Sequence, residues 1–201
     1  MSQPILDDDA STPIFVPAYP FVNAPGADFI LRSSNGVDFA VHRAILSLVS
    51  PVLETTLSVP QPKGTPVIPV MDMEEDAVLL DQILRFFYPT SQPTVITLEE
   101  LRRIIDILLQ KYEMEGIIPT IKQQLEKYVV ADPITVFSVA CKHGWKDVAM
   151  AAAKASLKHP LRAVDAEAPP VLASITALAY HNLLHYHSRC AAAAQRRISG
   201  G

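Results

Sequence analysis

The sequence predicts an α+β fold from three observations. Short β-prone runs are confined to the first half of the chain. An Asn35–Gly36 pair separates two of them, at 28–32 and 37–41, and this pair is a strong hairpin signal because both residues tolerate a positive φ. Apolar residues with helical spacing fill the second half. Strands confined to the first half of a chain and followed by runs of helices are typical of this class.

Two short helices and a third strand are expected after the hairpin. Residues 42–48 are amphipathic. Ser50–Pro51 supplies an N-cap and a first-turn proline for a second helix that reaches Leu57. Three prolines predict a loop over 58–66, and 67–71 is a candidate third strand.

A capping box predicts where the next helix begins. Asp72 is followed three residues later by Glu75, ahead of an apolar-rich segment at 77–88. Pro89 ends that segment, because proline cannot continue a helix from the residue before it.

The second half is expected to be entirely helical. Thr97 and Glu100 form a second capping box at the start of 98–112, and Gly116 interrupts the run. Asp132–Pro133 has the same N-cap and proline pattern as Ser50–Pro51, and Gly144 stands where a helix ends. The remaining predicted helices span 117–130, 134–143, 145–159 and 170–187.

Composition narrows the classes of function. The chain has 201 residues, of which 49% are hydrophobic and 19% are charged, and these are globular values. Its net charge of −4 predicts neither a nucleic-acid nor a membrane partner, because both need clustered cations. The two cysteines, Cys141 and Cys190, are too few for a disulfide framework. The start of the chain lacks the pattern of a secretory leader, so we expect an intracellular protein, in the cytoplasm or the nucleus.

Motifs of nucleotide-binding loops, nucleophile elbows and zinc proteases are missing from the sequence, so we predict no catalytic residue, no cofactor and no metal. One cluster resembles a metal site. His181 and His185 are four residues apart on a predicted helix, with His187 and Cys190 nearby. No convincing fourth ligand accompanies them, and we interpret these histidines as solvated or partly packed. A cryptic metal-dependent enzyme is the alternative that rests on this cluster.

Five segments in a fixed order carry a resemblance to the BTB/POZ domain. They are Ala27–Leu31, Phe39–Leu46 with its His-Arg-x-x-Leu signature, Ser50–Leu53, Leu84–Tyr88 with its aromatic-Tyr end, and Leu109–Gly116 with its Lys-Tyr-x-Met turn. The resemblance implies the BTB/POZ fold, in which a small sheet is flanked by a helix cluster. Residues 131–145 look like the helical extension that follows this domain in many fungal members.

The resemblance also implies a domain organisation. We expect a proline-rich, partly disordered lead-in at 1–26 and the BTB/POZ domain at 27–130. A helical extension at 131–190 and a disordered tail at 191–201 would follow.

The function implied is protein–protein interaction without catalysis, through homodimerisation or recruitment of another protein. An alternative is a substrate adaptor of a cullin-type ubiquitin ligase. Such adaptors often carry an apolar-x-Glu motif in the loop after the second short helix. Here that loop offers Val59 but has Gln61 where the carboxylate would fall. We therefore expect weak or absent cullin binding.

Eight residues are candidates for a structural or interface role. We expect Asp28 to form an ion pair with Arg43, and Tyr88 and Trp145 to be packing anchors. The candidates are Asp28, His42, Arg43, Leu46, Val52, Leu53, Tyr88 and Trp145.

Overall fold

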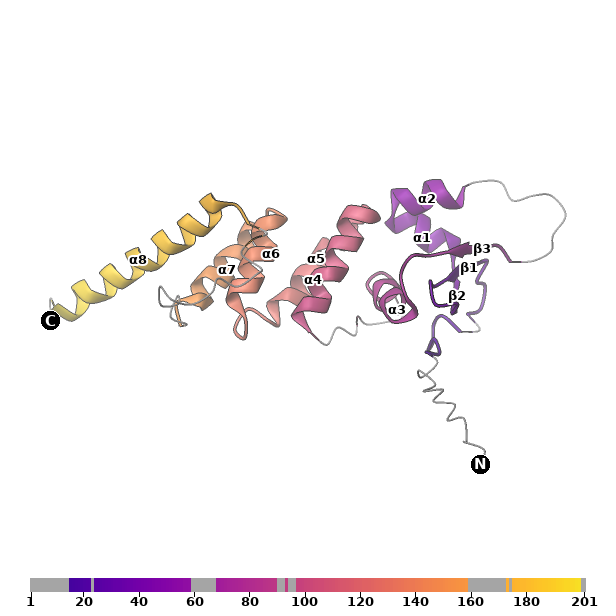
Figure 1. Ribbon diagram of the computed structural model, residues 1–201, viewed down its shortest axis with the longest axis horizontal. Helices are drawn as coiled ribbons and strands as arrows, with labels where there is room; N and C mark the ends of the chain where they lie inside the picture. Colours follow the sequence, from indigo (N-terminus) through magenta and orange to yellow (C-terminus); the bar gives the residue numbers. More distant parts are fainter. Residues whose placement is uncertain are drawn as a thin grey trace, which may run out of the picture. The chain divides into compact units, whose positions relative to one another are not determined.

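The computed structural model describes residues 15–22, 24–58, 68–89, 93, 97–158, 173 and 175–199 (Figure 1). These residues belong to two compact units. The first lies within Met1–Thr94 and Leu108–Glu115, and the second lies within Val95–Ile107 and Gly116–Gly201. The predicted lead-in up to residue 14 and most of the predicted loop at 58–66 lie outside the described residues.

The first unit contains a three-stranded mixed sheet in the order β2-β1-β3. Strands β1 (Phe29–Arg32) and β2 (Asp38–Val41) pair antiparallel, which confirms the predicted hairpin. Strand β3 (Val70–Asp72) pairs parallel with β1, placing Ile30 opposite Val70. The third strand is therefore present, at 70–72. The chain must cross over to make this parallel pair, since parallel strands cannot be joined by a tight turn.

The hairpin turn is held by its own side chains. Gly36 has a φ of 82°, in the left-handed region that favours glycine. The Ser33 hydroxyl donates to the Asn35 side-chain oxygen at 2.7 Å and accepts from the Val37 N–H. Asn35 Oδ1 also accepts from the N–H of Ala77 at 2.9 Å. The turn is thereby fastened to the start of the next long helix.

Helices α1 (Arg43–Val49) and α2 (Pro51–Leu57) follow the hairpin and pack against each other (Figure 1). Ser50 separates them. Its hydroxyl oxygen accepts from the Leu53 N–H at 3.0 Å, as the predicted N-cap requires, and the same hydroxyl donates to the Tyr112 carbonyl at 2.6 Å. Pro51 occupies the first turn of α2, where its missing N–H costs nothing.

Helix α3 (Ala77–Arg85) begins with a different cap from the one predicted. Asp76 is its N-cap and accepts from the Leu79 N–H at 2.9 Å. The predicted box of Asp72 with Glu75 is wrong, because β3 extends through Asp72 and the helix cap falls at Asp76. Glu75 is instead a buried carboxylate.

The described residues of the second unit form helices joined by turns, with no strand among them. Thr97 and Glu100 form the predicted capping box, and Asp132 caps α6 through the Thr135 N–H. Gly144 ends α6 with a φ of 72°. The helices are α4 (Leu98–Asp106), α5 (Ile118–Glu126), α6 (Pro133–Lys142), α7 (Lys146–Ser156) and α8 (Ala177–Ser199). The fold class is thus α+β, a small mixed sheet with helices followed by further helices.

The helix predicted over 98–112 changes its geometry before it ends. It is α-helical to Asp106, and a π-helical turn, η1 (Ile107–Lys111), follows. The break comes at Glu113, a non-glycine residue with a φ of 51°, rather than at Gly116. A 3₁₀ turn, η2 (Glu115–Ile117), then leads into α5.

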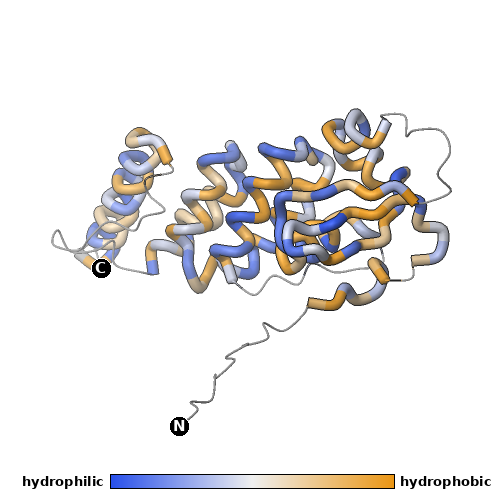
Figure 2. The backbone as a smooth tube through the Cα atoms, turned by 45° about the vertical axis from the view of Figure 1, so that its right-hand side comes forward, coloured by the Kyte–Doolittle hydropathy of each residue, from blue (hydrophilic) through white to orange (hydrophobic). Residues whose placement is uncertain are grey.

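Helix α8 extends through Ser199 and so includes most of the segment expected to be a disordered tail. Thr176 caps it, since its hydroxyl accepts from the Ala179 N–H at 3.1 Å. Figure 2 shows hydrophilic and hydrophobic residues alternating along this helix. Among the described residues, no helix has the length and apolar character needed to cross a membrane.

The hairpin glycine provides a test of this fold. We expect Gly36→Ala to lower the free energy of unfolding by about 1–2 kcal/mol, the cost of a left-handed backbone for an L-residue. Gly116→Ala is the matched control, because its φ is not positive and an added Cβ would meet nothing within 4 Å. Urea unfolding of both variants gives the comparison. Equal stability of the two would contradict the assignment of backbone strain to residue 36.

Candidate functional site

The Tyr88 hydroxyl lies at the centre of the first unit's polar contacts. It accepts a hydrogen bond from the His42 main-chain N–H at 2.8 Å and lies 3.3 Å from Nδ1 of the same residue. His42 Nε2 lies 3.0 Å from the Pro25 carbonyl oxygen. The Phe21 and Tyr88 rings meet edge to face, with centroids 4.9 Å apart. One side chain therefore links the segment before β1, the start of α1 and the end of α3.

These contacts define the proton positions on His42. A carbonyl oxygen can only accept, so Nε2 carries the proton that reaches Pro25. Nδ1 is then free to accept from the Tyr88 hydroxyl in the neutral ring. Burial raises the pKa of Tyr88, which keeps that hydroxyl protonated. The contacts of His42 and Tyr88 thus join three segments of the first unit through hydrogen bonds.

Asp28 and Arg43 meet, but not as the predicted ion pair. The Asp28 carboxylate accepts from the main-chain N–H of Arg43 at 2.8 Å and so satisfies a free donor in the first turn of α1. The guanidinium points elsewhere. It donates to the Leu57 carbonyl at 3.1 Å and lies 5.1 Å from the centre of the Phe29 ring. Asp28 lies beside the end of β2, where its N–H donates to the Val41 carbonyl at 3.2 Å, and its carboxylate therefore reaches the start of α1.

The predicted apolar candidates divide between core and surface. Leu46 and Leu53 are 0% and 4% exposed and support the inner faces of α1 and α2. Val52 is half-buried. The side chain that α1 presents outward is Leu48, which is 85% exposed. Leu48 is not among the eight candidates named from the sequence, although it lies in the segment 42–48 that is expected to form an amphipathic helix.

An open depression of about 380 Å³ lies against α2. Its lining combines apolar and hydroxyl side chains with one carboxylate, and consists of Pro51, Val52, Thr55, Thr56 and Glu113. Glu113 reaches this position because the Ser50 hydroxyl holds the preceding residue, Tyr112, by its carbonyl. Four of the five lining residues belong to α2, and Leu48 belongs to α1, the helix that precedes it.

Glu75 belongs to a second polar cluster within the first unit. It is 5% exposed and accepts from the Tyr112 hydroxyl at 2.9 Å and from the Lys111 ammonium at 2.7 Å. Burial and the adjacent Glu75 charge raise the pKa of Tyr112. Hydrogen bonds from Lys111 to Glu75 and Glu74 outweigh desolvation and raise the pKa of Lys111. Because all three groups are paired, this cluster holds Lys111 and Tyr112 beside the residue that precedes the N-cap of α3.

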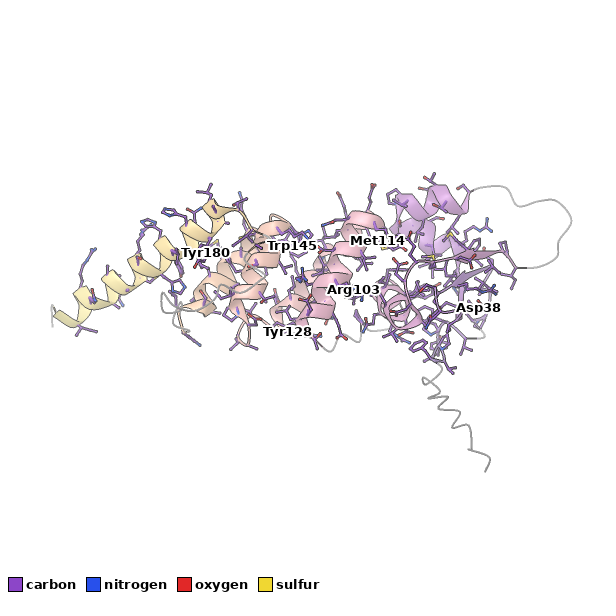
Figure 3. The ribbon with its side chains drawn as sticks, in the orientation of Figure 1. Asp38, Arg103, Met114, Tyr128, Trp145 and Tyr180 are labelled. Carbon is purple, nitrogen blue, oxygen red and sulfur yellow. The ribbon has the colours of Figure 1, made fainter. Side chains whose placement is uncertain are left out.

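In the second unit, Trp145 is a packing anchor (Figure 3). It is 7% exposed and stacks on the His143 ring with centroids 5.0 Å apart. Burial lowers the pKa of His143, although Asp106 lies 3.4 Å away. Lys142 neutralises Asp106 more directly, at 2.7 Å. Trp145 thus packs on a histidine that lies beside the Asp106–Lys142 ion pair.

The Tyr88 contact generates one prediction. Tyr88→Phe should lower the free energy of unfolding by about 1–3 kcal/mol, because it leaves the His42 N–H without a partner. Tyr19→Phe, at a tyrosine that is 63% exposed, is the control and should change little. Chemical denaturation of both proteins measures the difference. A Tyr88→Phe protein as stable as the control would show that water replaces the hydroxyl without cost.

The hydrogen bond between the Asp28 carboxylate and the Arg43 N–H generates a second prediction for this site. Asp28→Ala should cost about 1 kcal/mol, as expected for loss of a helix cap, and Asp28→Asn should cost less because an amide oxygen still accepts. In a double-mutant cycle with Arg43→Gln, we expect a coupling energy within about 0.5 kcal/mol of zero, since the two side chains do not interact directly. A coupling of several times that size would instead support the ion pair.

The sequence matches one known family of protein domains. The BTB/POZ domain family matches residues 23–128, which is 106 of the 201 residues. No curated protein matches the chain. The BTB/POZ domain is generally a protein–protein interaction module and is typically non-catalytic. The hairpin, α1 to α3 and the Tyr88 contacts with His42 and Pro25 all lie within the match, and the chain belongs to the BTB/POZ family.

Proposed function

We propose that this protein is a non-catalytic self-association module, and that two copies meet through the outward side of α1 and α2. This α1–α2 face is defined by Ala44, Leu48, Pro51, Val52 and Thr55, which are exposed or half-buried. Leu48 is the observation that carries the proposal. A leucine side chain that is 85% exposed gains about 1.5–3 kcal/mol when it is fully buried.

The charge pattern of this face supports a protein partner. Between 43 and 57 the only charged residues are Arg43 and Glu54. The Arg43 guanidinium is already engaged with the Leu57 carbonyl and the Phe29 ring. The centres of protein interfaces are depleted in charge, because each buried charge must lose its hydration. The face thus offers apolar and hydroxyl groups, and few charged groups would lose their hydration when a partner covers it.

A second copy is the simplest partner for such a face. Self-association is common among BTB/POZ domains, and a symmetric dimer brings the same patch of each copy together, so that each exposed leucine is buried by an equivalent surface. A stable interface of standard size buries about 1,600 Å² in total, which this face would supply together with neighbouring residues.

Leu48 therefore provides the decisive variant. Leu48→Glu should weaken self-association at least about tenfold, since it removes apolar burial worth more than about 1.4 kcal/mol and adds a charge to the interface. The stability of the monomer should change by less than about 0.5 kcal/mol, because the side chain is exposed there. Analytical ultracentrifugation over a concentration series measures the first quantity, and urea unfolding measures the second.

The control variant is Met150→Glu, which places the same charge at an exposed apolar position of α7 in the second unit. It should leave self-association unchanged. A wild-type chain that stays monomeric at high concentration would contradict the proposal. Equal weakening by both variants would show that the charge acts non-specifically.

Recruitment of another protein is the second candidate, favoured by the depression beside α2. Its apolar and hydroxyl side chains and its single carboxylate, Glu113, suit an apolar anchor next to a cation of a partner. A cullin adaptor is the version of this role that the family resemblance suggests. The loop at 58–66 carries Gln61 in place of the expected glutamate, and residues 59–66 of it lie outside the described residues.

Gln61→Glu tests the adaptor role. We expect the wild-type chain to bind a purified cullin N-terminal region weakly or not at all. The variant should bind more tightly if the missing charge is the cause, because truncating one partner of a charged contact typically costs about 2–5 kcal/mol. Calorimetry on both proteins measures this. Sub-micromolar binding by the wild type would make the adaptor role the leading one.

A further inference from the structure

Helix α8 brings two histidines together on one exposed side. The rings of His181 and His185 lie with their centroids 6.4 Å apart and their planes within 3° of parallel. Both side chains are exposed. Residues four apart on a helix have Cβ atoms about 5–6 Å apart, so the backbone itself holds the two imidazoles side by side.

The rest of the histidine cluster faces other groups. The Ser156 hydroxyl lies 2.8 Å from Nε2 of His187, which turns that ring toward α7. Cys190 lies five residues beyond His185, and its side chain is half-buried. Within the residues that the structure describes, no group of three or more His, Cys, Asp or Glu side chains could hold one metal ion. The structure therefore leaves a pair where the sequence shows a cluster of four.

We propose that His181 and His185 form a two-imidazole binding site for a late first-row transition metal ion, with Cu²⁺ bound most tightly. Neutral imidazole suits Cu, Ni and Zn ions, and affinity along this series peaks at Cu²⁺. Metal–nitrogen distances of about 2.0–2.1 Å require the two rings to close by roughly 1–2 Å, which exposed side chains achieve by rotation about χ1 and χ2. Water fills the remaining coordination positions.

The surroundings set the selectivity and the strength of this site. Helix α8 contains no Asp or Glu, so the site lacks the carboxylate oxygens that Mg²⁺ and Ca²⁺ need. Arg189 stands one turn beyond His185, and its positive charge opposes a bound dication. Binding is thus of the moderate strength that two ligands give. A metal ion bound by both histidines also stabilises one turn of α8, whose first turn is already capped by Thr176.

Isothermal titration of the full chain with CuCl₂, NiCl₂ and ZnCl₂ tests the proposal. We expect one Cu²⁺ site per chain, bound more tightly than Ni²⁺ or Zn²⁺. His181→Ala and His185→Ala should each weaken Cu²⁺ binding at least about tenfold, since even changes outside the ligand shell cost about 10–100-fold. His187→Ala should leave the affinity unchanged.

A matched variant tests whether Cu²⁺ binding depends on the spacing of the two histidines or only on the number of histidines in α8. The double change His185→Ala with Asn182→His keeps three histidines on the helix, as in the wild type. It places two of them at adjacent positions, where side chains do not face each other. It should bind Cu²⁺ as weakly as His185→Ala alone. Wild-type affinity in this variant, or in His185→Ala, would overturn the proposal, as would an equal loss in His187→Ala. The site does not depend on the proposed self-association, so failure of one leaves the other standing.

Discussion

The bond between the Tyr88 hydroxyl and the His42 N–H, at 2.8 Å, connects residues that are 46 positions apart. His42 precedes the first residue of α1, and Tyr88 follows the last turn of α3. The same hydroxyl orders the His42 ring against the Pro25 carbonyl, and the tyrosine ring packs on Phe21. The direction in which α1 leaves the sheet therefore depends on this contact, and with it the side of α1 that Leu48 occupies.

Ser50 has a comparable role at the start of the next helix. Its hydroxyl both caps α2 and holds the Tyr112 carbonyl, which places Glu113 beside α2. Glu113 has a φ of 51°, a conformation that a non-glycine residue keeps only where surrounding contacts demand it. The flanking residues, Tyr112 and Met114, are 5% and 1% exposed and supply those contacts. Glu113 lines the depression beside α2 because the two residues that flank it are buried and hold its exposed carboxylate in place.

Features decided within three or four residues could be predicted from the sequence. The Asn35–Gly36 turn and the Thr97 and Asp132 caps are all present, because each depends on hydrogen bonds between near neighbours. Glu75 could not be assigned correctly in this way. Its spacing from Asp72 fits a capping box, yet its partners, Lys111 and Tyr112, are 36 and 37 residues away. A local pattern cannot show that a carboxylate will be buried against a distant cation.

Local sequence patterns also could not show which residues of the candidate site are exposed. Sequence motifs identify the α1–α2 segment, but Leu46 and Leu53 face the core while Leu48 faces outward. The pattern predicts an amphipathic helix at 42–48, and it does not show that Leu48 lies on the side away from the core. An amphipathic helix normally presents polar residues to solvent. One side of α1 is buried within its own unit, and the other is left with an exposed leucine. It is this mismatch between composition and burial, more than any single motif, that argues for a partner on the outer side.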